Sequence, residues 1–185
     1  LGAIEAELDT AHAVIICDYS KGAVTQELLD GLRAMCKPRG VWMSFDPKPA
    51  HQLDLVGMSL ITPNRGELFA LAGLPDEATE ASLNAAVAAV QEKFEPAIML
   101  VTLSEHGMLL CPRDAKSTVI PTVAQEIYDV SGAGDTVIAS FTLAIAAGAS
   151  PDEAAVFSNH AAGVVVGKMG TAVVTPRELS GSFYA

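Results

Sequence analysis

The sequence predicts an α/β fold with a mainly parallel sheet that is covered by helices on both faces. Short, continuous apolar segments alternate with longer segments in which apolar residues recur at helical spacing. Half of the 185 residues are hydrophobic but only 5% are aromatic, and this composition favours close packing of helices on a sheet over a β-sandwich. Strand–helix alternation makes neighbouring strands parallel. The length fits a single domain over residues 1–185 more readily than two very small ones.

The first two predicted strands each end in polar residues. Ala13–Cys17 is a continuous apolar segment, typical of a strand that is buried on both faces. Thr25 can cap a helix over 26–36, which Lys37-Pro-Arg-Gly40 would end. Val41–Phe45 is the second strand. Because ligands of open α/β sheets bind at the carboxyl ends of the strands, we expect the functional site there.

The middle of the chain continues the alternation. Ser59–Thr62 is a short third strand, and Asn64 can cap a helix that stops at Gly73. An alanine-rich helix covers Glu80–Phe94, and Ala97–Thr102 is another buried strand.

The last part of the sequence predicts two more strands and two long helices. Met108–Cys111 and Ser117–Pro121 are joined by a short link, so we expect them to pair antiparallel. One helix is predicted over 136–148, and Ser150 caps another that reaches about Lys168. Residues 171–175 would add a last strand.

Charge and cysteine content restrict the partners and the location. The net charge of −11 and the pI near 4.6 argue against nucleic acid and anionic membranes, which need clustered basic residues. The three cysteines, Cys17, Cys36 and Cys111, lack the paired spacing of a zinc site and indicate thiols in a reducing compartment. The apolar segments are interrupted by polar residues, so we expect a cytoplasmic protein without a membrane span.

The most informative stretch is Asp129-Val-Ser-Gly-Ala-Gly-Asp135. A Gly-Ala-Gly turn at a helix start presents unpaired amides and the positive end of the helix dipole, which is typical of an anion site. Gly132 and Gly134 have no side chain that would obstruct a phosphate. A carboxylate at Asp135 suits a base that activates a hydroxyl for attack on a phosphoryl group. The structural alternative is that Ser131 is only an N-cap and Asp135 only favours the first helical turn.

Two further groups suit phosphate chemistry. Asn64 and Glu67 are three residues apart at a helix start, where they could organise hydrated Mg²⁺ or could simply form a capping box. Lys48 follows a strand end, where it could reach nucleotide phosphates or could be an ordinary surface lysine.

The segment 129–135 resembles the C-terminal signature of the ribokinase-like (PfkB) carbohydrate kinases, in which a D-T-x-G-A-G-D type run supplies an anion hole and the catalytic base. The resemblance implies that Asp135 is the base and that Gly132, Ala133 and Gly134 form the anion hole, with Ser131 beside the nucleotide. Asn64 and Glu67 match the N-x-x-E motif of these kinases, which acts in magnesium and phosphate binding. Asp46-Pro-Lys48 is similar to their D-P-K segment near the nucleotide phosphates.

The same resemblance implies other nucleotide contacts. Residues 102–107 are similar to a T-L-G-x-x-G loop that lines the nucleotide site, but Ser104 replaces the first glycine, so only Thr102 and Gly107 are carried over. Asn159 matches a helix position that borders the adenine in relatives, and an exposed position on a helix face is the alternative. Ser140 stands where the family usually has Ala or Gly.

Three segments resemble one branch of the family, the bacterial D-glycero-β-D-manno-heptose 7-phosphate kinases. These segments are Asp18-Tyr-Ser-Lys-Gly22, which is similar to D-Y-x-K-G, Asp46-Pro-Lys48, and residues 162–171. Asp18 and Lys21 would then face an acceptor sugar, and the alternative is that they are ordinary turn residues.

The resemblance implies a ribokinase-like three-layer α/β/α fold that transfers phosphate from ATP, with Mg²⁺, to a sugar or sugar phosphate. The implied acceptor is a heptose 7-phosphate, which would place the protein in ADP-heptose synthesis. The match covers only the C-terminal, nucleotide-binding and catalytic portion of such a kinase. The resemblance implies that the N-terminal strands and the lid, through which relatives often dimerise, lie outside this sequence.

Three alternatives stay open at this point. One is another kinase of the family, such as a ribokinase, a fructokinase or a phosphofructokinase. Another is a catalytically silent module that binds a nucleotide or a sugar phosphate. A Rossmann-type cofactor domain would need a G-x-G-x-x-G after the first strand, which Asp18-Tyr-Ser-Lys-Gly22 does not supply.

Overall fold

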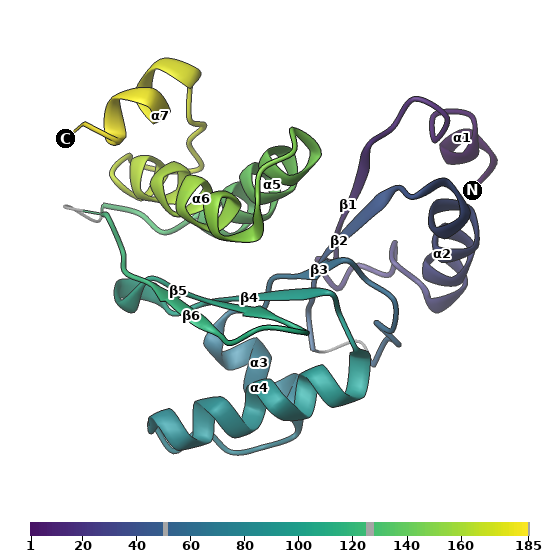
Figure 1. Ribbon diagram of the computed structural model, residues 1–185, viewed down its shortest axis with the longest axis horizontal. Helices are drawn as coiled ribbons and strands as arrows, with labels where there is room; N and C mark the ends of the chain where they lie inside the picture. Colours follow the sequence, from purple (N-terminus) through teal and green to yellow (C-terminus); the bar gives the residue numbers. More distant parts are fainter. Residues whose placement is uncertain (50–51, 125–127, 185) are drawn as a thin grey trace.

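The computed structural model describes residues 1–49, 52–124 and 128–184, and these form three layers (Figure 1). The strands are β1 (Ala13–Cys17), β2 (Trp42–Asp46), β3 (Leu60–Ile61), β4 (Ile98–Thr102), β5 (Met108–Pro112) and β6 (Thr118–Ile120). They make one six-stranded sheet in the order β1-β2-β3-β4-β5-β6. Strands β1 to β4 pair in parallel, whereas β5 pairs antiparallel with both β4 and β6. The predicted α/β fold and the antiparallel pair are therefore confirmed.

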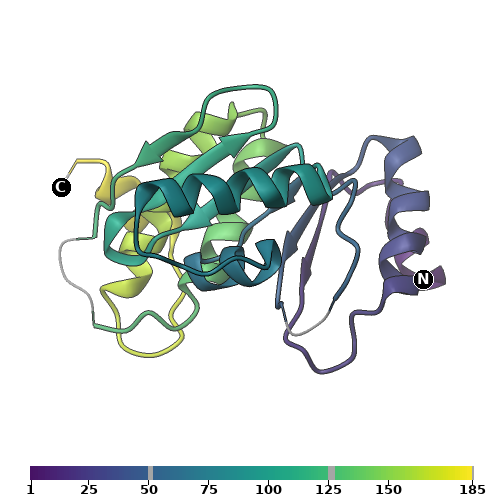
Figure 2. The ribbon, with the colours of Figure 1, turned by 90° about the horizontal axis from the view of Figure 1, so that it is seen from below.

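Helices cover both faces of this sheet (Figures 1 and 2). The helices are α1 (Gly2–Glu5), α2 (Gln26–Arg39), α3 (Arg65–Ala72), α4 (Glu80–Phe94), α5 (Ala133–Ala146), α6 (Pro151–Val166) and α7 (Pro176–Ser182), with a 3-10 turn, η1, at Ser104–His106. Alternate residues of β4 face opposite layers, as the pleat requires. Met99 and Val101 pack into a core with α2, α3 and α4, whereas Ile98 and Leu100 pack with α5 and α6.

The helix boundaries follow local capping chemistry. Thr25 and Asn64 accept hydrogen bonds from backbone amides in the first turns of α2 and α3, and Gly40 and Gly73 end these helices in the left-handed conformation. Helix α2 continues past its predicted end to Arg39, because the left-handed residue that ends it comes only at Gly40. Pro38 lies inside its last turn.

Three local predictions need correction. Residues 171–175 are not a strand, because they lie beside α5 and α6 rather than at a sheet edge, and Thr175 caps α7. Helix α5 begins at Ala133, three residues earlier than predicted, because Gly132 at φ +79° serves as its N-cap. Strand β1 is not buried on both faces, since Ile15 in its middle is 41% exposed.

The described helices include none that is long and apolar enough to cross a membrane. The cysteines Cys17, Cys36 and Cys111 are free thiols. All three are expected to be buried from the sequence, and this is confirmed for Cys36 and Cys111, whereas Cys17 is partly exposed.

Candidate active site

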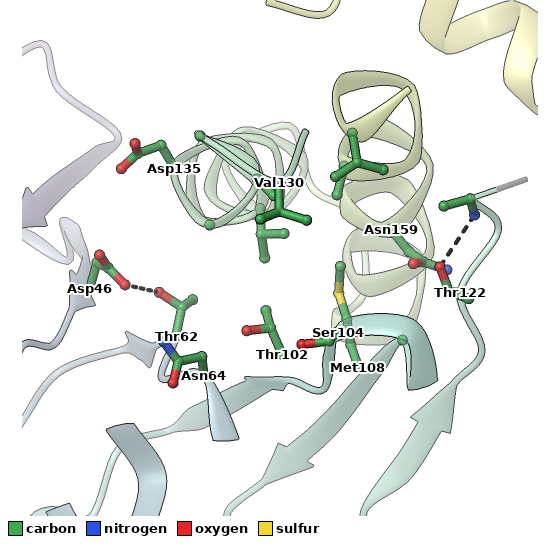
Figure 3. A pocket seen from close by; sticks show the side chains of 18 of the residues that line it. Asp46, Thr62, Asn64, Thr102, Ser104, Met108, Thr122, Val130, Asp135 and Asn159 are labelled. Carbon is green, nitrogen blue, oxygen red and sulfur yellow. Dashed lines mark hydrogen bonds between the residues drawn. The ribbon is translucent and has the colours of Figure 1, made fainter. Parts of the chain in front are cut away.

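A pocket of about 480 Å³ lies where the carboxyl ends of β2 and β4 meet the first turn of α5 (Figure 3). Its volume is within the range of small-molecule sites. Figure 3 shows Asp135 and Val130 on one side, Asp46, Thr62 and Asn64 at the strand ends, and Asn159 on the opposite wall. Most of the residues predicted from sequence line it: Lys48, Asn64, Glu67, Thr102, Gly107, Gly132, Ala133, Gly134, Asp135 and Asn159.

The turn before α5 leaves room in front of the helix start. Gly132 is left-handed, and a Cβ there would lie 3.3 Å from a methyl group of Thr171, so this position requires glycine. A Cβ at Gly134 would meet no atom within 4 Å, because it would point into open space. The first turn of this helix is closed by the amide of Thr136, which donates to Gly132 O at 2.9 Å. The helix start is therefore open to an anion.

One amide of the predicted anion hole already has a partner within the protein. The amide of Ala133 donates to the carbonyl oxygen of Val130 at 3.2 Å. The glycine amides on either side of it, at Gly132 and Gly134, are the better donors for a ligand. The sequence alone could not indicate which of these three amides has a hydrogen-bond partner within the protein, because the turn geometry decides this.

Ser131 does not line the pocket. Its amide donates to Asp129 Oδ1 at 2.9 Å, while Asp129 Oδ2 accepts from the amide of Gly170 at 3.0 Å. These hydrogen bonds, led by that from Ser131, lower the pKa of Asp129. Asp129 thus ties the turn before α5 to the segment that follows α6, and Ser131 takes part in that tie rather than capping the helix.

A lysine and two acidic residues form a charged cluster at the opposite side of the pocket. Lys48 Nζ lies 2.6 Å from Glu67 Oε1 and 3.4 Å from Asp46 Oδ2. Burial raises the pKa of Asp46, although the charge of Lys48 opposes this shift. Burial alone would lower the pKa of Lys48, but the hydrogen bond to Glu67 and the charge of Asp46 raise it. Lys48 is therefore a fixed cation in this pocket.

Asn64 and Glu67 form the capping box that sequence allowed, and they also line the pocket. The amide of Glu67 donates to Asn64 Oδ1 at 2.9 Å, and the amide of Asn64 donates to Glu67 Oε2 at 2.8 Å. An isolated parallel bridge between Asn64 and Thr102 extends the β3–β4 pairing into the pocket. The structural and functional interpretations of Asn64 and Glu67 are therefore compatible, since the cap fixes both side chains at the pocket wall.

The loop after β4 depends on two unusual backbone conformations. Ser104 is left-handed at φ +54°, which explains why a glycine suits this position. Gly107 has φ +84°, and a Cβ there would collide with the carbonyl oxygen of Ile120 and lie 2.6 Å from the amide of Thr122. Gly107 thus allows this loop to pack closely against the segment that follows β6.

Asn159 is not on an exposed helix face, because it is only 4% exposed and faces the pocket from α6. Its Nδ2 atom donates to the carbonyl oxygen of Pro121 at 2.6 Å. This hydrogen bond holds the segment after β6 against α6 and forms one wall of the pocket.

The turn after β1 contributes a different residue from those predicted. Asp18 is buried and its Oδ1 accepts from the amide of Ser20 at 2.8 Å, while Lys21 is exposed, and neither residue lines the pocket. Tyr19 does line it, and its hydroxyl donates to Asp135 Oδ1 at 2.9 Å. Sequence reasoning selected the charged residues Asp18 and Lys21 of the D-Y-x-K-G segment and not Tyr19, because the partner of Tyr19 is 116 residues away.

Comparisons with known sequences identify a family for this arrangement. A family model described as pfkB family carbohydrate kinase matches residues 3–178. Over 179 residues the chain is 41% identical to bifunctional protein HldE of Sulfurimonas denitrificans, covering 97% of this chain and 37% of that protein. The corresponding protein of Vibrio cholerae is 43% identical over 180 residues, with 97% and 37% covered. The chain thus spans little more than a third of the length of these relatives.

Solved structures with a similar fold are sugar and sugar-phosphate kinases. The ribokinase of Arabidopsis thaliana, described as complexed with ribose and ATP, has a TM-score of 0.87 at 23% identity, covering 98% of this chain and 59% of that one. Phosphofructokinase-2 of Escherichia coli, described in complex with potassium, has a TM-score of 0.82 at 18% identity, covering 99% and 60%. At these identities the likeness shows a shared ribokinase-like fold.

Proposed function

The chain belongs to the pfkB family of carbohydrate kinases, and we propose that it forms the nucleotide-binding and catalytic part of an ATP-dependent sugar kinase. The observation that carries this proposal is the arrangement of one pocket. Asp135 lies in the first turn of α5, behind a glycine turn that is open to an anion, and the same pocket contains the cation of Lys48. A base, an anion cradle and a phosphate-binding cation are the groups that phosphoryl transfer to a hydroxyl requires.

In this proposal Asp135 accepts the proton of the acceptor hydroxyl as its oxygen attacks the γ-phosphorus of ATP. A new oxygen–phosphorus bond forms, the bond between the γ-phosphorus and the bridging oxygen breaks, and ADP leaves with the bond electrons. The amides of Gly132 and Gly134 and the positive end of α5 stabilise the charge that builds on the phosphoryl oxygens. A positioned general base contributes about 10²–10⁴-fold to such a reaction.

The residues present also fit Mg²⁺, which would neutralise phosphate charge when bound. Glu67 and Asn64 would organise it at the pocket wall. The described residues include no cluster of three or more His, Cys, Asp or Glu that could hold a metal. Few direct protein ligands suit Mg²⁺, because this ion keeps several waters and takes other ligands from substrate phosphates.

We propose a heptose 7-phosphate as the acceptor, in the synthesis of ADP-heptose. The support is the 41–43% identity to proteins named HldE and the D-Y-x-K-G resemblance of residues 18–22. Asp18 and Lys21 stay predicted acceptor residues, although neither lines the described pocket. A different sugar kinase of the family and a silent binding module are the competing hypotheses. A cytoplasmic location and a homodimer also stay predictions.

The first experiment is a calorimetric titration of this chain with MgADP, compared with Gly134→Val. The valine side chain would enter open space in front of α5, so it would obstruct the anion cradle without clashing with the protein. Gly181→Val is the matched control, because Gly181 is also in a helix with open space at its Cβ but lies outside the pocket. We expect saturable binding that Gly134→Val abolishes and the control retains. Equal binding by all three proteins would contradict the proposed nucleotide site.

The second experiment measures turnover of the complete protein with a panel of sugars and sugar phosphates. Asp135→Asn should lower kcat by about 10³-fold while the Kd for MgADP changes by less than about threefold, because the base acts in the transition state. Equal losses of turnover and MgADP binding would argue against a base. MgADP binding without transfer to any acceptor would favour the silent binding module.

A further inference from the structure

Tyr19 reaches the proposed base from a distant part of the chain. It lies in the turn after β1, whereas Asp135 lies in the first turn of α5, yet the Tyr19 hydroxyl donates to Asp135 Oδ1 at 2.9 Å. In the described part of the chain, no other side chain forms a hydrogen bond or an ion pair with Asp135. The contact therefore needs a structural explanation beyond local turn chemistry.

Packing of the ring does not explain the position of Tyr19, because the residue is 58% exposed. The backbone explains it better. The amide of Asp18 donates to the carbonyl oxygen of Asp46 at 3.3 Å, and Asp18 Oδ1 accepts from the amide of Ser20. Cys17, which ends β1, packs against the core that contains α5. The turn is thus fixed on both sides of Tyr19 and directs the hydroxyl toward Asp135.

The electrostatic surroundings restrict what Tyr19 can do. The hydrogen bond to the Asp135 carboxylate, together with its charge, raises the pKa of Tyr19 to about 12. Tyr19 therefore stays protonated and remains a donor throughout the physiological pH range, so it is not itself a base. Cys17 and Asp46 also face this carboxylate from the ends of β1 and β2, and neither brings a positive charge. The Tyr19 hydroxyl therefore provides a neutral hydrogen-bond donor to Asp135.

We infer that Tyr19 is a positioning residue for Asp135, which holds Oδ1 of the carboxylate so that Oδ2 faces the acceptor hydroxyl. This inference rests on the proposed function, in which Asp135 is the base. The acceptor proton moves to Asp135 Oδ2, and Tyr19 keeps its own proton throughout. The hydrogen bond thus orients the carboxylate for proton transfer.

The kinetic test is Tyr19→Phe in the complete protein, which removes only the hydroxyl. We expect kcat to fall about tenfold with the KM for ATP unchanged, because a charge-assisted hydrogen bond to the base is lost. Tyr184→Phe is the control, because Tyr184 is 90% exposed and lies outside the pocket.

A titration that does not depend on activity tests the contact itself. The ring-carbon resonance of Tyr19 in protein labelled with ¹³C-tyrosine is assigned by its loss in Tyr19→Phe. Its midpoint should lie near 12 in the wild type and fall toward the ordinary value of 10.0 in Asp135→Asn. An unchanged midpoint overturns the contact. If the wild type is active and Tyr19→Phe leaves kcat unaltered, the positioning role alone is overturned. An inactive wild type overturns the proposed function and this role with it.

Discussion

Lys48 Nζ lies 2.6 Å from Glu67 Oε1, and this ion pair joins the segment after β2 to the first turn of α3. The other oxygen of Glu67 accepts from the amide of Asn64, so both oxygens of this carboxylate are engaged. Asp46 lies 3.4 Å from the same ammonium and is 6% exposed. One cation thus balances two carboxylates at the pocket wall, where phosphates are proposed to bind.

Removal of this cation should weaken nucleotide binding. In Lys48→Met, Asp46 and Glu67 lose the cation that balances them, and their negative charge would repel nucleotide phosphates. We expect the Kd for MgADP to rise by about tenfold or more, and by less at high salt because the repulsion is screened. Calorimetry at two ionic strengths measures this. Lys93→Met, which removes a charge from α4 outside the pocket, is the control, and an equal effect of both substitutions would contradict the prediction.

Gly107→Ala should destabilise the fold. The added Cβ would collide with the backbone after β6, and the φ of +84° with ψ of −127° is a conformation open essentially to glycine. We expect a loss of about 3 kcal/mol or more in the free energy of unfolding, measured by urea denaturation. Gly148→Ala is the matched control, because its φ of +93° is also positive but its Cβ would meet no atom within 4 Å. It should cost about 1–2 kcal/mol. Similar losses in both variants would contradict the collision.

Much of the fold could be predicted because its signals are local. Asn64, Thr25 and Ser150 cap helices where their side chains predicted it, and Gly40 and Gly73 end helices in the left-handed conformation. The first six apolar segments predicted as strands form β1 to β6. The strand predicted at residues 171–175 does not form. A β-like sequence forms a strand only where a sheet edge is available, and this segment lies beside helices instead.

The candidate site was predictable where a motif is continuous in sequence, as at residues 129–135 and at Asn64 with Glu67. Relationships across the fold could not be predicted. The hydrogen bond of Tyr19 to Asp135 and that of Asn159 to Pro121 join distant segments, and nothing local indicates either. The hydrogen bond from the Ala133 amide to Val130 could not be predicted for another reason, since it depends on turn geometry rather than on residue type.

Asn159→Asp should destabilise the protein at neutral pH although the side chain keeps its shape. A carboxylate cannot donate to the carbonyl oxygen of Pro121, so two acceptors would face each other in a buried position. We expect a loss of about 1–3 kcal/mol in the free energy of unfolding. Asn84→Asp, on the exposed face of α4, should change stability by less than about 0.5 kcal/mol. Thermal denaturation of both variants distinguishes them, and a stable Asn159→Asp would show that the hydrogen bond is dispensable.

Glu178 should make the docking of α7 depend on pH. Its Oε1 lies 2.7 Å from Lys168 Nζ, and its Oε2 accepts from the amide and the hydroxyl of Thr175, each at 2.8 Å. The hydrogen bond from Lys168, followed by those from Thr175, lowers the pKa of Glu178 to about 2 from an ordinary value of 4.5. A carboxylate with a depressed pKa in the folded state stabilises that state fully above its unfolded pKa. The stabilisation is then lost as the pH falls through the folded value.

The contribution of Glu178 should therefore be complete above pH 4.5 and should disappear between pH 4.5 and about 2. The measurement is the pH dependence of the amide chemical shifts of α7 in the wild type and in Glu178→Gln. The difference between the two should be constant near neutrality and vanish toward pH 2, and salt should reduce it because the ion pair is exposed to solvent. Glu92→Gln, which removes an equal charge from an exposed position on α4, should leave α7 unchanged. A difference that grows as the pH falls would contradict the assignment, because it would require Glu178 to be stabilised in its protonated form.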